Sequence, residues 1–298
     1  LQLACEAVGV LLELNVIDSP EQARAGACNL LPCGDLDRED ITPGALSEEC
    51  GSAALGYVDR AVRDALDGAI DAIVTLPMNK EATRLRHPDF TGHTERIATA
   101  CGTDRYTMML ASEKLAVTHV STHLSMRRAV DAVRRGRILD VVELTHEGLS
   151  QLMERPRIAV AGLNPHAGEH GSFGTEEIEQ IEPAVRAAQE KGIACEGPIP
   201  PDTVFMRAFE GRWDAVVCMY HDQGHIPMKL MGFGQTVNVT IGLPIVRCSV
   251  DHGTALDLAG TDRADPGSLG AAIALAEALA RRARGAPAGP PGGKGEIG

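Results

Sequence analysis

The sequence has few aromatic residues and few basic ones. Its 298 residues include five Phe, three Tyr and one Trp, and 28 Lys and Arg stand against 41 Asp and Glu, which gives a net charge of −13. Nucleic acids and anionic membranes attract basic surfaces, and single-stranded nucleic acids also stack on aromatic rings. The composition therefore argues against both partners. Because 44% of the residues are apolar and only 23% are charged, a disordered chain is also excluded.

Long apolar runs and paired cysteine motifs are also absent. No segment approaches the roughly 18 apolar residues of a membrane helix, and no signal peptide is visible. The eight cysteines are scattered and contain no C-x-x-C pair. Such a pattern predicts free thiols in a reduced, cytoplasmic protein.

Three common catalytic or nucleotide-binding motifs are missing. The sequence contains no G-x-G-x-x-G after a strand, no G-x-x-x-x-G-K-[ST] and no G-x-S-x-G. These absences remove the Rossmann fingerprint, the P-loop and the simplest serine hydrolase. Any nucleotide must bind another loop, and the segment SVDHGTALDLAG is the candidate.

Short β-branched runs alternate with longer amphipathic stretches over most of the chain. This alternation predicts an α/β fold with a parallel sheet covered by helices on both faces. The expected helices cover 52–66, 126–135, 176–191 and 269–284, and the first ten residues also resemble a helix interior. The last fourteen residues, 285–298, hold six Gly and three Pro and are expected to be a disordered tail. The expected strands cover 11–17, 71–76, 106–110, 115–120, 157–163, 214–219, 236–241 and 245–250.

Polar clusters follow many of the predicted strands. Ligands of open parallel sheets bind where the carboxyl ends of the strands converge, so we expect these clusters to form one site. The clusters are TLPMNKEA, TGHTE, VSTHLS, GLNPHAGEHGSFG, YHDQGH and SVDHGTALDLAG.

Histidines at strand ends are candidate metal ligands. His119 and His123 lie four apart in a segment with strand composition, where four residues span roughly 13 Å, too far for one ion bound at about 2.0 Å. We prefer His123 as the ligand and interpret His119 as a core histidine. His166 and His221 each follow another predicted strand, and three such imidazoles are typical of a catalytic divalent-metal site. Three unconnected turn histidines remain the alternative.

Further polar residues stand in apolar or helix-initiating contexts. His93 and Thr94 begin a helical stretch, which either binds phosphate through free N–H groups or is simply capped. Lys229 and Arg247 have apolar neighbours and need an anionic partner, either a substrate or an internal carboxylate. Asn238 lies in an otherwise buried run and should form a hydrogen bond.

These motifs together resemble a known family. The segments TLPMNKEA, TGHTE, GLNPHAGEHGSFG, PPDTVF, YHDQGHIPMKL and GFGQTVNVTIGLPIVRCSVDHGTALDLAG are similar to signatures of the 4-hydroxythreonine-4-phosphate dehydrogenase family. The resemblance extends from about residue 11 to 279. It implies an isocitrate/isopropylmalate dehydrogenase-like fold, with two α/β domains around a cleft and a homodimer.

The resemblance assigns a role to each candidate residue. It implies that three histidines bind one divalent metal ion (Zn, Co, Ni, Mn or Mg), with His221 contributed by the partner subunit. It also implies that NAD or NADP binds the loop around residues 252–257 and that Lys229 and Asp202 are catalytic. The implied metal ligands are His123, His166 and His221; the substrate-binding residues are His93, Thr94, Lys229, Asn238 and Arg247; the cofactor-binding residues are His252, Gly253, Thr254, Ala255 and Asp257.

The implied reaction is oxidation of a phosphorylated 3-hydroxy acid followed by decarboxylation. HVSTHLSMR, PPDTVF and His225 resemble the branch that acts on 4-phospho-D-threonate or 4-phospho-D-erythronate and yields dihydroxyacetone phosphate and CO2. The alternatives are 4-hydroxythreonine-4-phosphate, from pyridoxal phosphate biosynthesis, and a cis-diol carboxylate. A metal-dependent hydrolase and a non-catalytic remnant are further alternatives.

The resemblance also predicts the domain limits. Residues 1–92 with 250–284 are expected to form the cofactor-side domain, and residues 93–249 the domain with the metal site and the dimer interface. The family normally opens with a strand and a glycine-rich loop, and the chain, which starts at Leu1, is expected to lack both.

Overall fold

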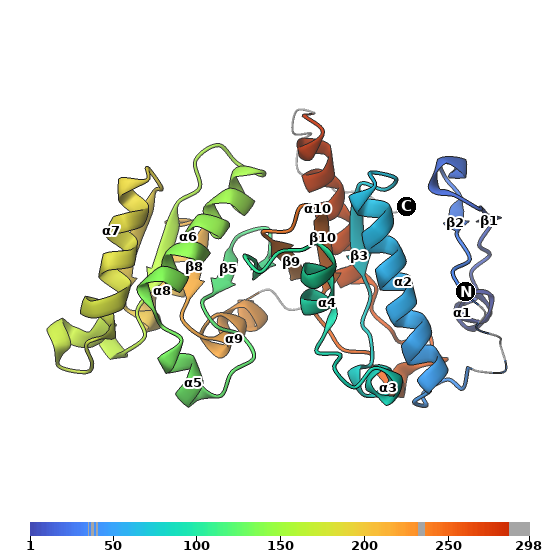
Figure 1. Ribbon diagram of the computed structural model, residues 1–298, viewed down its shortest axis with the longest axis horizontal. Helices are drawn as coiled ribbons and strands as arrows, with labels where there is room; N and C mark the ends of the chain where they lie inside the picture. The colour runs from blue at the N-terminus through green and yellow to red at the C-terminus, as the bar shows by residue number, and fades with distance from the viewer. Residues whose placement is uncertain (35, 37–38, 40, 232–235, 286–298) are drawn as a thin grey trace.

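A computed structural model describes residues 1–34, 36, 39, 41–231 and 236–285. The predicted tail lies outside these residues except for Gly285. One eight-stranded sheet crosses the molecule in the order β3-β10-β9-β4-β5-β8-β6-β7, and a separate pair, β1 (Leu14–Val16) and β2 (Cys28–Leu30), lies at one end (Figure 1). The strands of the large sheet are β3 (Ala72–Thr75), β4 (Thr107–Ala111), β5 (Ala116–His119), β6 (Ile158–Ala161), β7 (Cys195–Ile199), β8 (Ala215–Cys218), β9 (Val237–Ile241) and β10 (Val246–Val250).

The α/β prediction is confirmed, but the expectation of a purely parallel sheet is wrong. β10–β9, β9–β4 and β4–β5 pair antiparallel in the middle of the sheet, whereas β3–β10 and β5–β8–β6–β7 pair parallel. Only four residues join β4 to β5 and β9 to β10. A parallel pair needs a crossover of about a dozen residues, so these short connections force hairpins.

The helices form two groups (Figure 1). One group surrounds β5–β8, and the other surrounds β3, β9 and β10, with α1 (Gln2–Val8) beside the β1–β2 pair. The first group comprises α5 (Met126–Asp131), α6 (Arg135–Ser150), α7 (Glu182–Glu190), α8 (Pro201–Phe209) and α9 (His221–Met231). The second comprises α2 (Glu48–Leu66), α3 (Lys80–Arg86), α4 (His93–Ala100) and α10 (Gly267–Ala283).

A strand occurs in each of the eight predicted segments. Six agree with the predicted limits within one residue, whereas β1 begins three residues later than predicted and β6 ends two residues earlier. The edge strand β7 was not predicted, because CEGPI carries Gly and Pro, which are tolerated at sheet edges and weaken a strand signal. Helices α3, α8 and α9 were also not predicted. The start of α3 is nevertheless encoded locally, since the Asn79 side chain accepts a hydrogen bond from Ala82 N at 2.9 Å.

The core lies on both faces of the sheet. β5, β6 and β8 are buried along their whole length, as strands covered on both faces must be. The described part of the sheet includes strands from both predicted domains, and the predicted domain limits stay a prediction. No described helix is long and apolar enough to cross a membrane.

Candidate active site

Arg247 is a buried cation on β10, the strand next to the edge strand β3. Only 3% of the residue is exposed, and its Nη atoms donate to three threonine hydroxyls: Thr75 at 2.8 Å, Thr240 at 3.0 Å and Thr94 at 3.3 Å. Within the described residues no carboxylate lies within 4.0 Å of the guanidinium. Burial lowers the pKa of Arg247 to about 10, so it stays charged at neutral pH. A buried charge needs a counter-charge, so this site is prepared for an anion.

Two buried polar atoms near this cation lack a hydrogen-bond partner in the described structure: Arg247 Nε and Asn238 Oδ1. The register pairs Ser249 with Asn238, and Arg247 bonds the Thr240 side chain two residues further along β9, so these residues share one face. The Asn238 amide reaches only Met108 Sδ, at 3.1 Å. The unused donor and acceptor fit a polar ligand over this face of the sheet.

The start of α4 lies over the same cation. Thr94 connects it to Arg247, and His93 is the first residue of the helix after the extended Gly92. Burial, with Arg247 and Lys80 nearby, lowers the pKa of His93 to about 4, so the ring is neutral at pH 7. Neutral imidazole, hydroxyl and free helix N–H groups suit an anion. The same first turn also carries Glu95, whose negative charge partly offsets the lowering of the Arg247 pKa by burial.

Four imidazoles gather between β5 and α9. The rings of His221 and His225 stack with centroids 3.6 Å apart, and the His123 centroid lies 6.1 Å from that of His221. His225 Nδ1 lies 3.2 Å from His119 Nε2 and 3.1 Å from the His221 carbonyl oxygen. His119 is fully buried, which agrees with its prediction as a core histidine.

Three of these four histidines, His119, His123 and His225, have lowered pKa values, which favours their neutral form. Burial lowers the pKa of His119 to about 3 and that of His225 to about 4, and it also lowers the pKa of His123. Neutral imidazole is the form that binds metal ions. Glu95 Oε1 lies 3.9 Å from His123 Nδ1, so a carboxylate stands behind this candidate ligand.

His166 does not join this cluster in one chain. Its ring lies 6.2 Å from Phe173, and the residue lines a different cavity, together with Glu169, His170 and residues of α7. Among the described residues no three His, Cys, Asp or Glu are grouped closely enough to hold a metal ion. The chain thus brings His123 and His221 together and leaves His166 elsewhere.

The segment that carries His166 has an unusual backbone. Residues 166–170 have φ values of 54°, 52°, 80°, 41° and 54°, a run of left-handed conformation that includes four non-glycine residues. Each such residue costs roughly 1–2 kcal/mol. A run of this kind persists only where the surroundings hold it.

Lys229 is placed beside the predicted cofactor loop. Its Nζ lies 4.0 Å from Asp251 Oδ2, and burial raises the pKa of Asp251. The predicted loop 252–257 follows Asp251 directly; His252, Gly253, Ala255 and Asp257 are exposed, and Thr254 is half-buried. Ala255 has a left-handed φ of 44°. The loop is thus largely exposed and lies next to a lysine.

Asp202 stands apart from the other predicted residues. It is exposed in the first turn of α8, and no described hydrogen bond or ion pair connects it with them. The sequence interpretation did not select Thr75, Thr240, Glu95, Asp251 or Glu177. Thr75 and Thr240 carried a usable signal, a hydroxyl within a predicted buried strand.

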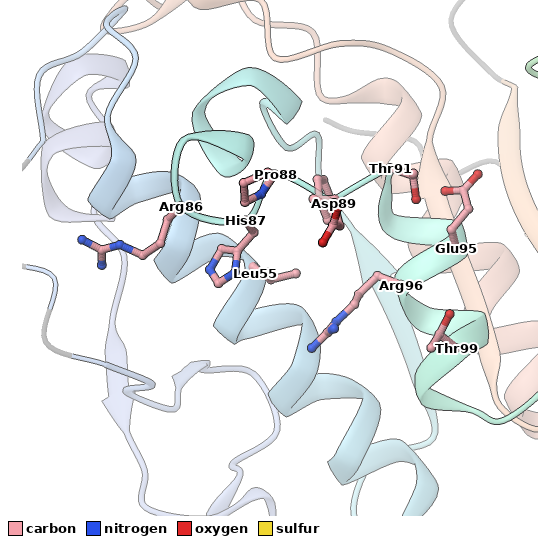
Figure 2. Close-up of a pocket in the computed structure, with 10 residues that line it drawn as sticks. Leu55, Arg86, His87, Pro88, Asp89, Thr91, Glu95, Arg96 and Thr99 are labelled. Atoms are coloured by element: carbon pink, nitrogen blue, oxygen red, sulfur yellow. The ribbon is translucent and has the colours of Figure 1, made fainter.

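A separate cavity of about 440 Å³ lies beside α4 on the side of α2 (Figure 2). Figure 2 shows Arg96 extending from α4 and His87 and Arg86 extending from the end of α3. Arg96 is paired with Asp59 at 2.6 Å, and Arg86 is paired with Glu48 at 2.8 Å. These arginines are already neutralised, so this cavity lacks the unpaired cation that distinguishes Arg247.

The fold and the site define an α/β protein with a buried arginine that has no paired carboxylate in the described structure and with a neighbouring cluster of four imidazoles. Residues 2–276 match the family described as pyridoxal phosphate biosynthetic protein PdxA. The chain therefore belongs to the PdxA family.

Similar proteins carry two kinds of name. D-threonate 4-phosphate dehydrogenase of Pectobacterium atrosepticum is 45% identical over 90% of this chain and 83% of its own. 4-hydroxythreonine-4-phosphate dehydrogenase of Desulfosudis oleivorans is 49% identical over 88% of this chain and 79% of its own. The crystal structure of 4-hydroxythreonine-4-phosphate dehydrogenase from Klebsiella pneumoniae matches with a TM-score of 0.84 and 44% identity, and covers 94% of this chain and 86% of that chain.

Proposed function

We propose that this chain is a divalent-metal- and NAD-dependent enzyme that oxidatively decarboxylates a 4-phosphorylated 3-hydroxy acid. The substrate is 4-phospho-D-threonate or 4-phospho-D-erythronate. Hydride leaves C3 for NAD, the resulting β-keto acid loses CO2, and dihydroxyacetone phosphate remains. Relatives named D-threonate 4-phosphate dehydrogenase, at 45% identity, support this substrate class.

The observation that carries the proposal is the unpaired, buried Arg247. A phosphate ester would accept from the free Nε donor and supply the missing negative charge. Thr94 and the first turn of α4 stand over the same cation, so His93 and Thr94 are the proposed phosphate contacts. Asn238, with its unpartnered Oδ1, is the proposed partner of a substrate hydroxyl. Binding at the phosphate fixes the reacting carbons before the reaction.

The imidazole cluster fits a divalent metal ion only in part. His123 and His221 are two nitrogen donors whose ring centroids lie 6.1 Å apart, and among the described residues neither His225 nor the buried His119 completes a group of three metal ligands with them. A bound ion would polarise the substrate hydroxyl and stabilise the negative charge that develops on decarboxylation. We propose His166 as the third ligand, supplied by a second copy of the chain. This changes the expectation that His221 comes from the partner, because His123 and His221 lie together here.

A homodimer is consistent with the exposed apolar side chains around this region. Large apolar residues on α5, α8, α9 and the segment after His166 are 36–81% exposed. Apolar side chains left in water are typical of surfaces that another chain covers. These residues are Met126, Val130, Phe173, Met206, Ile226, Leu230 and Met231.

Lys229 is the proposed proton carrier. It lies on α9 beside Asp251, which precedes the loop 252–257, and its ammonium could protonate the enolate left after decarboxylation. Asp251 would direct the ammonium toward this loop, where the nicotinamide nucleotide is proposed to bind. Asp202 remains a proposed catalytic residue without a described contact. The eight cysteines, all free, support a cytoplasmic location.

4-hydroxythreonine-4-phosphate is a second candidate substrate. Its phosphate would use the same Arg247 site, and the 49% identical relative from Desulfosudis oleivorans carries that name. A solved terephthalate 1,2-cis-dihydrodiol dehydrogenase from Burkholderia xenovorans is less similar, with 29% identity and a TM-score of 0.66. A diol carboxylate lacks the phosphate that the buried cation favours.

The function is tested with a panel of phosphorylated and unphosphorylated acids, NAD or NADP, and a chelator. We expect NAD reduction with phosphorylated acids, release of dihydroxyacetone phosphate and CO2, and loss of turnover with chelator. An aminoketone phosphate would identify the second candidate substrate. Preference for an unphosphorylated diol would contradict the phosphate site, product without nicotinamide would indicate a hydrolase, and binding without turnover would indicate a non-catalytic chain.

The shared metal site has its own test, in which His166→Ala and His221→Ala subunits are mixed after denaturation. If each site uses both subunits, a mixed dimer contains one intact site. Random mixing should then restore about a quarter of the wild-type activity. No recovery, with proven mixed dimers, would show that all three ligands come from one chain.

A further inference from the structure

A buried carboxylate lies under the left-handed segment that carries His166. Glu177 is 1% exposed and begins the short π-helical turn η4 (Glu177–Ile181). One of its oxygens accepts from Leu163 N and Asn164 N, both at 2.7 Å. The other accepts from Asn164 Nδ2 at 2.9 Å. All these bonds fix the chain just before His166.

The loop is built closely around this carboxylate. A Cβ atom on Gly168 would lie 2.7 Å from Glu177 Oε2, and one on Gly162 would lie 3.3 Å from Glu177 Oε1. Gly168 also has a left-handed φ of 80°. A Cβ atom on Gly174 would likewise lie 2.5 Å from Asn164 Nδ2. Glycines therefore let the backbone wrap around Glu177 and Asn164.

This carboxylate has no cation partner among the described residues. None of the described ion pairs includes Glu177, so the loop amides and Asn164 satisfy it. A buried charge without a counter-ion is a poor source of stability compared with an apolar side chain of the same size. Directional bonds to two consecutive amides, however, define the exit direction of β6 and oppose relaxation of the strained run.

We propose that Glu177 is a positioning residue that holds residues 166–170 in the left-handed conformation and thereby directs the His166 imidazole. The inference deepens the proposed function, since it takes His166 as a metal ligand. Glu177 touches neither substrate nor metal. It acts through the Leu163 and Asn164 amides, the backbone of Gly168 and the turn that follows.

The test compares Glu177→Gln and Glu177→Ala with Glu179→Gln. Glu179 is exposed on the same turn, so its variant is the matched control. Amide hydrogen exchange of the segment 163–174 should become at least tenfold faster in Glu177→Ala and less so in Glu177→Gln, which keeps one acceptor. Exchange of β8 should not change in any variant. Unchanged exchange of residues 163–174 in both Glu177 variants would overturn the proposal that Glu177 holds this segment.

Cobalt binding supplies the second readout. Substitution of residues that orient metal ligands typically weakens metal binding 10–100-fold, so the Co²⁺ dissociation constant should rise by that factor in Glu177→Ala, with an altered visible absorption spectrum. Glu177→Gln should recover part of the affinity, and Glu179→Gln should match the wild type. A loosened segment with unchanged Co²⁺ affinity and spectrum would overturn the positioning role.

Two further points keep the test decisive. If Glu177→Ala does not fold, Gly168→Ala attacks the same contact from the loop side and should give the same two changes. If the wild-type chain binds no Co²⁺ at all, the metal-dependent function fails. The hydrogen-exchange result would still decide whether Glu177 holds the loop.

Discussion

The Arg247 site and the imidazole cluster differ in how completely one chain builds them. Arg247 is buried with three hydroxyl partners and lacks only an anion. The cluster has two candidate ligands together, while the third lies beside Phe173. An anion site made of strands can form within one sheet. Under the proposed function, the metal site takes His166 from another chain, so metal binding would depend on dimer formation.

The two regions also differ in what supports them. Threonine hydroxyls surround Arg247. The His221 ring instead stacks on His225, which in turn contacts His119. The first arrangement holds a fixed positive charge, and in the second, burial lowers the pKa values of His119, His123 and His225. Under the proposed function, the first region binds a negative ligand and the second a positive one.

Replacing Arg247 should have the largest effect. Removing one partner of a buried charge pair costs about 2–5 kcal/mol, so Arg247→Met should lower kcat/KM for the phosphorylated substrate roughly 30- to 5,000-fold. The unfolding free energy should stay equal or rise, because the free protein no longer buries an unpaired charge. Enzyme kinetics measure kcat/KM, and urea unfolding measures the unfolding free energy.

The matched control is Arg212→Met, since Arg212 is exposed and paired with Glu196 at 3.0 Å. Its kinetics should equal those of the wild type. If Arg247→Met kept its kcat/KM but lost stability, Arg247 would be a structural residue and the contrast between the two regions would fail.

Gly224→Ala should damage the imidazole cluster selectively. A Cβ there would lie 2.6 Å from His119 Nε2 and 2.8 Å from Cys218 Sγ, so α9 must shift. We expect a loss of about 1–3 kcal/mol in the unfolding free energy, as for overpacked cores, and a lower melting temperature.

Gly56→Ala in α2 is the control, because its Cβ would meet no atom within 4 Å. It should gain about 0.5–1 kcal/mol by helix propensity. Equal effects of the two substitutions would mean that α9 does not pack tightly on His119.

Acid should weaken the protein through the buried histidines. His119 and His225 have folded-state pKa values of about 3 and 4, below the ordinary 6.5. Between pH 6.5 and 4 these two histidines are protonated in the unfolded chain but stay neutral in the folded chain. The free energy of unfolding therefore falls as the pH falls. The slope is about 1.4 kcal/mol per pH unit for each such histidine.

Urea unfolding at several pH values measures this slope. In His119→Gln the slope should be smaller by the contribution of one histidine. A slope that does not change in His119→Gln would show that this ring is not held neutral by the fold.

Asp251→Asn should have the smallest effect. Asp251 connects the two regions through Lys229, but the 4.0 Å separation and the half-exposed lysine limit the pair to less than about 1 kcal/mol of stability. The unfolding free energy measured in urea should therefore change by less than about 1 kcal/mol. A loss above about 2 kcal/mol would mean that the pair holds α9 against β10 and is not reserved for catalysis.

Much of the fold followed from local patterns. β-branched runs located eight strands, and the interpretation of His119 as a core histidine is confirmed. The assumption that His123 shares its strand is wrong, because β5 ends at His119 and His123 is exposed in the turn that follows. The sheet direction was predicted wrongly because the four-residue connections, which force antiparallel hairpins, were not weighed. Glu177 could not be found, because a glutamate in a helical segment normally faces solvent, and only the fold buries it.

The sequence by itself determined which chemical groups this protein has: histidines that follow strands, and an arginine within an apolar strand. Tertiary structure decided which of them meet. Arg247 bonds Thr75, which is 172 residues away, and His225 contacts His119, which is 106 residues away. Such contacts depend on strand order and register, and these are set by the packing of the whole sheet, which no local pattern encodes.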